Sequence, residues 1–139
     1  MLNAITLAKS SGAEIPVGAV ILKDNEVIAA AHNLKESLND VTAHAEILAL
    51  REAAQKLGRW RLEDCEMYVT LEPCPMCAWA IIQSRLKSVH FGSYDANYGA
   101  FGSAVDLRPL AGSKLQVYGG IMEKECNKIL EDYFDTIRH

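Results

Sequence analysis

The chain has 139 residues, half of them apolar, and a formal net charge of −4 at neutral pH. A chain of this size and apolarity buries one hydrophobic core without disulfides, so we expect a single domain spanning residues 1–139. It has no apolar run long enough to span a membrane and no signal-peptide pattern, which predicts a cytoplasmic protein without membrane contact. The acidic balance argues against a uniformly basic nucleic-acid-binding surface, so any RNA contact must be local.

The first predicted elements are a short helix, a hairpin and a longer helix. Residues 4–10 end the short helix, and residues 16–22 and 26–31 form two strands joined across the polar turn at residues 23–25. Thr42 precedes a helix over residues 43–57, which ends before Gly58. Its predicted apolar face repeats at helical spacing, with Ile47, Leu50 and Ala54.

The second half continues the alternation of strand and helix. Residues 67–70 form a short buried strand, residues 74–85 a helix after Pro73, and residues 88–92 another strand. A Gly-rich stretch over residues 93–113 forms a long loop, where functional residues often concentrate. Residues 115–118 form the last strand, and residues 122–137 an amphipathic closing helix. The alternation predicts an α/β fold with parallel strand pairing.

Two short motifs place metal-binding side chains near the starts of two predicted helices. The first is Thr42-Ala43-His44-Ala45-Glu46 and the second is Glu72-Pro73-Cys74-Pro75-Met76-Cys77. Zinc favours thiolate and imidazole ligands, and three protein ligands leave a fourth tetrahedral position open for water, as in catalytic sites. We therefore predict one Zn²⁺ per chain, bound by His44, Cys74 and Cys77. Pro73 is expected to start the helix whose N-terminal dipole stabilises the two thiolates.

Glu46 is the predicted catalytic proton shuttle and is not expected to bind the metal. Bound zinc lowers the pKa of its water from about 15.7 toward about 7, so a zinc-bound hydroxide forms readily, but a proton carrier is still required. Residues two apart in a regular helix point about 200° apart, so His44 and Glu46 share a site only near a helix start. Thr42 as an approximate N-cap permits that placement.

Other interpretations of these residues remain open at this point. Four cysteines would form disulfides in a secreted protein, and an isolated Cys-x-x-Cys is also typical of a redox pair. A structural four-ligand zinc site needs a further donor, and none of the candidates lies in a second ligand-spaced pair. The candidates are Cys65, Cys126, His32 and His90. We interpret the two cysteines as core or near-surface thiols and the two histidines as structural residues at strand ends.

The two motifs together resemble those of the cytidine deaminase superfamily. Within it, nearly the whole chain is similar to the bacterial tRNA-specific adenosine deaminases, through residues 15–20, Ala31-His32-Asn33, Ser84-Arg85, and Phe91-Gly92 with Asp95-Ala96. The resemblance implies a three-layer α/β/α fold with a mixed five-stranded sheet, assembled as a homodimer. It also implies hydrolysis of the wobble adenosine of a tRNA anticodon loop to inosine, with release of ammonia.

The resemblance further implies four substrate-binding residues. Asn33 matches the asparagine that hydrogen-bonds the flipped base, Val17 lines the pocket, and Ala45 contributes backbone beside it. Asp95 matches the aspartate that contacts a neighbouring ribose, which would favour RNA over DNA. Without the resemblance, Asn33 would be interpreted as a turn residue and Asp95 as a solvated loop residue. The lysine that relatives carry shortly after this aspartate is missing, because the loop continues Ala96-Asn97-Tyr98.

Two other functions remain as alternatives. A zinc deaminase of a free base or nucleoside, of the guanine or cytosine type, shares the metal and the mechanism and differs only outside the zinc ligands. The acidic balance and the missing lysine are compatible with that function. A structural zinc-binding module that recruits a partner would need neither an open metal position nor the free carboxylate of Glu46.

Overall fold

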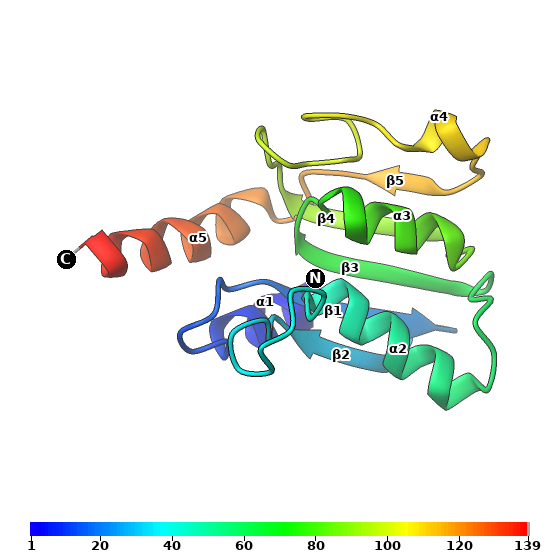
Figure 1. The fold of residues 1–139 in the computed structure, drawn as a ribbon, viewed down its shortest axis with the longest axis horizontal. Helices are drawn as coiled ribbons and strands as arrows, with labels where there is room; N and C mark the ends of the chain where they lie inside the picture. The colour runs from blue at the N-terminus through cyan, green and yellow to red at the C-terminus, as the bar shows by residue number, and fades with distance from the viewer. Residues whose placement is uncertain (139) are drawn as a thin grey trace.

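The centre of the protein is a five-stranded mixed sheet (Figure 1). The computed structural model describes residues 1–138, so the last residue of the expected 1–139 domain lies outside the described residues. The strand order is β2-β1-β3-β4-β5, with bounds β1 Gly18–Lys23, β2 Glu26–His32, β3 Cys65–Leu71, β4 Ser88–Ser93 and β5 Gln116–Tyr118. The first strand pairs antiparallel with β2 and β3, whereas β3, β4 and β5 run parallel. The predicted mixed five-stranded sheet is therefore confirmed.

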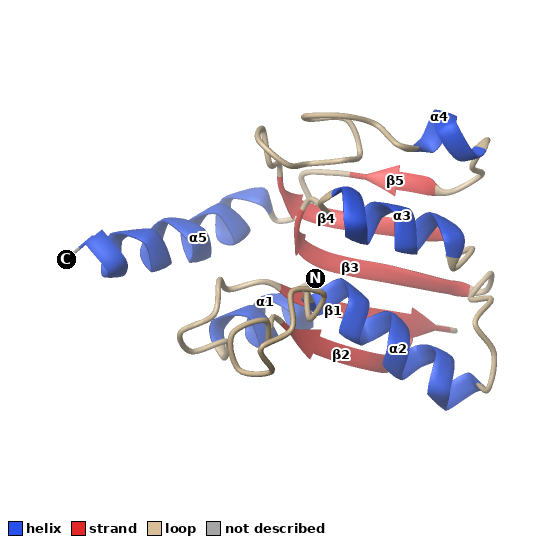
Figure 2. Cartoon of the chain, in the orientation of Figure 1, coloured by secondary structure: helices blue, strands red, loops and turns tan. Residues whose placement is uncertain are grey.

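Helices cover both faces of this sheet. Figure 2 shows α2 (Ala45–Leu57) and α3 (Pro75–Gln83) side by side on one face. The opposite face carries α1 (Leu2–Lys9) and the start of α5 (Glu123–Arg138), which contact each other. A short helix that the sequence did not predict, α4 (Arg108–Ala111), lies in the long loop before β5. The three-layer α/β/α arrangement is confirmed, and none of the helices in residues 1–138 is long and apolar enough to cross a bilayer.

The residues of α2 that pack on the sheet differ from those predicted. Ala45, Ala49 and Ala53 are fully buried, whereas the expected apolar face at Ile47, Leu50 and Ala54 is only half-buried. Small side chains at i, i+4 spacing let the helix axis lie close to the strands beneath it. The larger residues turn toward the sides of α2, where Leu50 packs against the edge of the core.

Both site-bearing helices begin later than predicted. The N-cap of α2 is His44 and not Thr42, and the N-cap of α3 is Cys74, with Pro75 as the first helical residue. Both N-cap residues have extended backbone conformations. Neither side chain caps its own helix, so both are free to point outward from a helix N-terminus. The chain thereby places an imidazole and a thiol at two neighbouring helix ends.

Candidate metal and substrate site

The imidazole of His44 and the thiols of Cys74 and Cys77 converge at the N-terminal ends of α2 and α3. The Nδ1 atom of His44 lies 3.8 Å from the Sγ of Cys74 and 3.4 Å from the Sγ of Cys77. The three ligand atoms all lie within 4.8 Å of one another. Ligand atoms that surround a tetrahedral zinc at its usual bond lengths lie roughly 3.4 to 3.8 Å apart, so this group fits such an ion.

The two thiols and the imidazole are linked by hydrogen bonds. A hydrogen bond from the Cys77 thiol lowers the pKa of Cys74 to about 4, and the same contact raises the pKa of Cys77. Hydrogen bonding to Cys74 also raises the pKa of His44. The lowered pKa of Cys74 favours the thiolate, which is the form that binds metals.

Glu46 lies beside this group on the first turn of α2. Its side chain is 4% exposed, and within residues 1–138 its buried Oε1 atom has no hydrogen-bond partner. Burial is the main cause that raises the pKa of Glu46 to about 7. A buried oxygen without a protein partner, in the wall of a cavity, is suited to meet a water molecule or a ligand.

Asn33 joins three segments around the start of α2. Its Oδ1 accepts a hydrogen bond of 2.8 Å from the backbone N–H of Ala45, and its Nδ2 donates to the carbonyl of Ile15 at 3.0 Å. The first free N–H of α2 is thus satisfied from the end of β2 and not by an N-cap side chain. The amide keeps one N–H for a ligand, because its other N–H is already bonded to the protein.

Glu72 is a buried carboxylate that the sequence interpretation did not assign a role. It is 2% exposed and accepts hydrogen bonds from the backbone N–H groups of Asp95, Phe101 and Ser103 at 3.1 to 3.2 Å. The glycine at position 99 is required there, because a Cβ at Gly99 would lie 2.3 Å from the Glu72 carboxyl carbon. Glu72 therefore fixes the loop after β4 against the segment that carries Cys74. The sequence feature that could have pointed to Glu72 is its position at the start of the second motif.

A cavity of about 570 Å³ opens beside the His/Cys/Cys group. Its lining includes most of the residues predicted from the sequence, namely Val17, Asn33, His44, Glu46, Cys74 and Asp95. Cys77 and Ala45 are fully buried behind the lining. The sequence interpretation missed several further lining residues, among them Glu14, Lys35, Tyr98 and Tyr133. They come from loops and from α5, where no metal-ligand spacing marks them.

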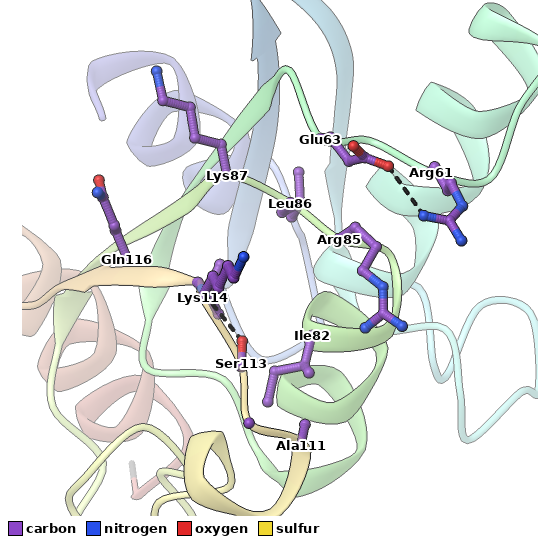
Figure 3. Close-up of a pocket in the computed structure, with 12 residues that line it drawn as sticks. Arg61, Glu63, Ile82, Arg85, Leu86, Lys87, Ala111, Ser113, Lys114 and Gln116 are labelled. Atoms are coloured by element: carbon purple, nitrogen blue, oxygen red, sulfur yellow. Dashed lines mark hydrogen bonds and ion pairs between the residues drawn. The ribbon is translucent and has the colours of Figure 1, made fainter.

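A second cavity of about 550 Å³ lies at the N-terminal ends of β4 and β5, where the segments that lead into these two strands line it (Figure 3). Its lining includes Arg61, which pairs with Glu63 at 3.2 Å, and three further basic side chains, Arg85, Lys87 and Lys114. None of the predicted metal, catalytic or substrate residues lines this cavity. The chemistry of the two motifs therefore belongs to the first cavity alone.

Comparison with known proteins places the chain in a family. A family model described as MafB19-like deaminase matches residues 2–138. The tRNA-specific adenosine deaminase of Bacillus subtilis (strain 168) is 42% identical over 142 residues, which cover 99% of this chain and 88% of that protein. This chain belongs to the tRNA-specific adenosine deaminase family. The resemblance inferred from the two motifs is thereby confirmed, and the chain is a hydrolytic deaminase.

Solved structures agree with membership of the tRNA-specific adenosine deaminases. A structure from a study of A-to-I editing by tRNA:A34 deaminases at the wobble position has a TM-score of 0.87 and 42% identity, covering 94% of this chain and 97% of that one. The guanine deaminase of Bacillus subtilis has 40% identity over 70% of this chain and 68% of that one, with a TM-score of 0.65. The deaminase fold therefore also occurs in an enzyme named for a free base.

Proposed function

We propose that this protein hydrolyses the wobble adenosine of a tRNA anticodon to inosine and releases ammonia. The observation that carries the proposal is the His44, Cys74 and Cys77 group, set beside the unpaired carboxylate oxygen of Glu46 in the wall of one cavity. The near full-length similarity to tRNA-specific adenosine deaminases supports a tRNA adenosine as the substrate.

The proposed cofactor is one Zn²⁺ held by His44, Cys74 and Cys77, whose ligand spacing fits it. When bound, zinc makes a water molecule nucleophilic at neutral pH. Glu46 would take the first proton of that water and pass it to a ring nitrogen of the base, and it would then carry the second proton of the same water to the departing amine, which leaves as ammonia. Its burial suits this role, because a carboxyl group with a pKa of about 7 both binds and releases a proton near neutral pH.

The proposed substrate contacts lie around the same cavity. The free N–H of the Asn33 amide donates to the base, Val17 forms an apolar wall, and the backbone at Ala45 lies beside the ring. The Oδ1 of Asp95 accepts the N–H groups of Asn97 and Tyr98 at 3.1 and 3.0 Å. Its second carboxylate oxygen is the proposed acceptor for a ribose hydroxyl.

We also propose that the enzyme is a cytoplasmic homodimer. Two large apolar side chains of α3 stay exposed, Met76 at 36% and Trp79 at 42%, and they are three residues apart on one side of the helix. Exposed apolar side chains on one helical face are typical of an interface between subunits. Sedimentation at micromolar concentration tests this, and a monomer would contradict it.

Deamination of a free base of the guanine type is the second candidate. It is favoured by the similarity to the Bacillus subtilis guanine deaminase and by the acidic lining of the cavity, which contains five carboxylates and one lysine, Lys35. Free guanine carries no phosphate, so it needs no cationic surface around the pocket.

Ammonia release, assayed in parallel on an anticodon stem-loop RNA and on free adenosine, cytidine and guanine, separates the two candidates. The stem-loop is expected to be the best substrate, because binding energy from its flanking nucleotides orients the base for reaction. Faster turnover of any free compound than of the stem-loop rejects the tRNA substrate and favours the second candidate.

A further inference from the structure

Tyr98 is a large aromatic side chain held at the rim of the catalytic cavity. It lines that cavity, yet 68% of the residue is exposed, and within residues 1–138 its hydroxyl has no hydrogen-bond partner. His44 and Glu46 lie in the same lining and are far less exposed. The same cavity thus has the buried Glu46 in its wall and an exposed aromatic side chain, Tyr98, at its rim.

Hydrogen bonds and close packing hold the loop that carries Tyr98. The carboxylate of Asp95 accepts the Tyr98 N–H at 3.0 Å, and the next residue, Gly99, donates to the Asp95 carbonyl at 2.8 Å. Gly99 packs against the buried carboxylate of Glu72, and Ala100 donates to the carbonyl of Pro73 at 2.9 Å. These contacts set the backbone of Tyr98 relative to the segment bearing Cys74, so a ligand would not have to order it.

The charges around the cavity leave little electrostatic attraction for an RNA backbone. Among the described residues that line the cavity, Lys35 is the one lysine or arginine, while the carboxylates are Glu14, Glu36, Glu46, Glu72 and Asp95. Position 97, beside Tyr98, carries an uncharged asparagine. Stacking of a base on an aromatic ring provides affinity that does not depend on charge, because every base has a π-face.

We propose that Tyr98 is a stacking platform for the nucleotide next to the target adenosine. This inference rests on the proposed RNA substrate and adds a residue that selects a polynucleotide over a free base or nucleoside. The ring stacks on one flanking base, so the free energy of that contact holds the neighbouring target base in the cavity. A free base or nucleoside has no flanking base and gains nothing from Tyr98.

The test compares Tyr98→Ala and Tyr98→Phe with wild-type enzyme on an anticodon stem-loop RNA. Stacking is worth about 5- to 150-fold per base, so Tyr98→Ala is expected to raise KM by that factor with little change in kcat. Tyr98→Phe keeps the ring and should stay within about twofold of wild type. The matched control is Tyr118→Ala, which removes a 46% exposed tyrosine of β5 that does not line the cavity.

Two further experiments test which base stacks on the ring of Tyr98 and whether the contact depends on charge. Two stem-loops are used, one with an abasic nucleotide before the target and one with it after the target. The stem-loop that lacks the stacked base should raise the wild-type KM by the same factor, and on it Tyr98→Ala should have no additional effect. The ratio of the KM values of Tyr98→Ala and wild type should stay constant between about 50 and 200 mM salt, because stacking releases no counterions. Zinc content and circular dichroism verify that each variant is folded.

The inference is overturned if Tyr98→Ala leaves KM unchanged, if Tyr98→Phe is as impaired as Tyr98→Ala, or if the loss persists on both abasic substrates. Failure of the proposed function has a different signature, because the wild-type enzyme would then deaminate a free base or nucleoside faster than the unmodified stem-loop.

Discussion

Replacing Glu72 with alanine should destabilise the protein more than a typical surface substitution. The change removes the acceptor of three backbone N–H groups and of the Ser103 hydroxyl. A hydrogen bond to a charged acceptor contributes about 1.5–3 kcal/mol, and a buried donor left unpaired costs about 1–3 kcal/mol. The amide of Phe101, in a residue that is only 5% exposed, cannot turn to water, whereas Ser103 is exposed and partly recovers.

We count the cost of the unpaired Phe101 amide in full and the costs of the Asp95 and Ser103 groups in part. The free energy of unfolding should then fall by about 3–5 kcal/mol. With an unfolding entropy of about 2.1 cal/mol/K per residue, this corresponds to a decrease in Tm of roughly 10–17 °C. Urea unfolding followed by circular dichroism measures the free energy, and calorimetry measures Tm. The isosteric Glu72→Gln keeps one acceptor oxygen and should lose less than half as much.

The matched control is Glu66→Ala, which removes a carboxylate of β3, the strand that Glu72 follows, and this carboxylate accepts one hydrogen bond, from the Ser88 hydroxyl. It should cost less than about 1 kcal/mol, because a hydroxyl readily finds another partner. A Glu72→Ala protein whose free energy of unfolding lies within about 1 kcal/mol of the Glu66→Ala control would refute the role assigned to the buried carboxylate.

Three further changes test the site and its surroundings. Glu46→Gln is expected to retain zinc, measured by atomic absorption, and to lose kcat by a factor of about 10² to 10⁴; a variant without metal would identify Glu46 as a ligand. Asp95→Asn should reduce the preference for an RNA stem-loop over its DNA counterpart at unchanged zinc content, and an unchanged preference contradicts the ribose contact. The N–H groups of Glu36 and Ser37 hold the pKa of Glu14 below its usual value, so the stability from this carboxylate is present above its ordinary pKa of 4.5 and is lost as pH falls through the lowered value. Wild type should therefore be more stable than Glu14→Gln in urea at neutral pH, with the difference vanishing in acid, and a difference independent of pH would refute the assignment.

The two motifs could be identified from the sequence because metal binding restricts residue types and spacing within short segments. Cys74 and Cys77 are three residues apart on one helix end, so their proximity is a local property. The hairpin and the alternation of helix and strand were likewise predictable, since both depend on neighbouring residues. The family resemblance added the mixed five-stranded sheet and the three layers, which periodicity alone does not give.

Tertiary contacts decided the features that the sequence interpretation missed or placed wrongly. The N-cap of α2 is His44 and not the predicted Thr42, because Asn33, directly after β2, accepts a hydrogen bond from the first N–H of the helix. Glu72 and Tyr98 acquire their positions from hydrogen bonds between the second motif and a loop more than 20 residues away. Local sequence determines which residues are capable of the chemistry, whereas long-range packing determines which backbone groups need a partner and which side chains remain exposed at the cavity rim.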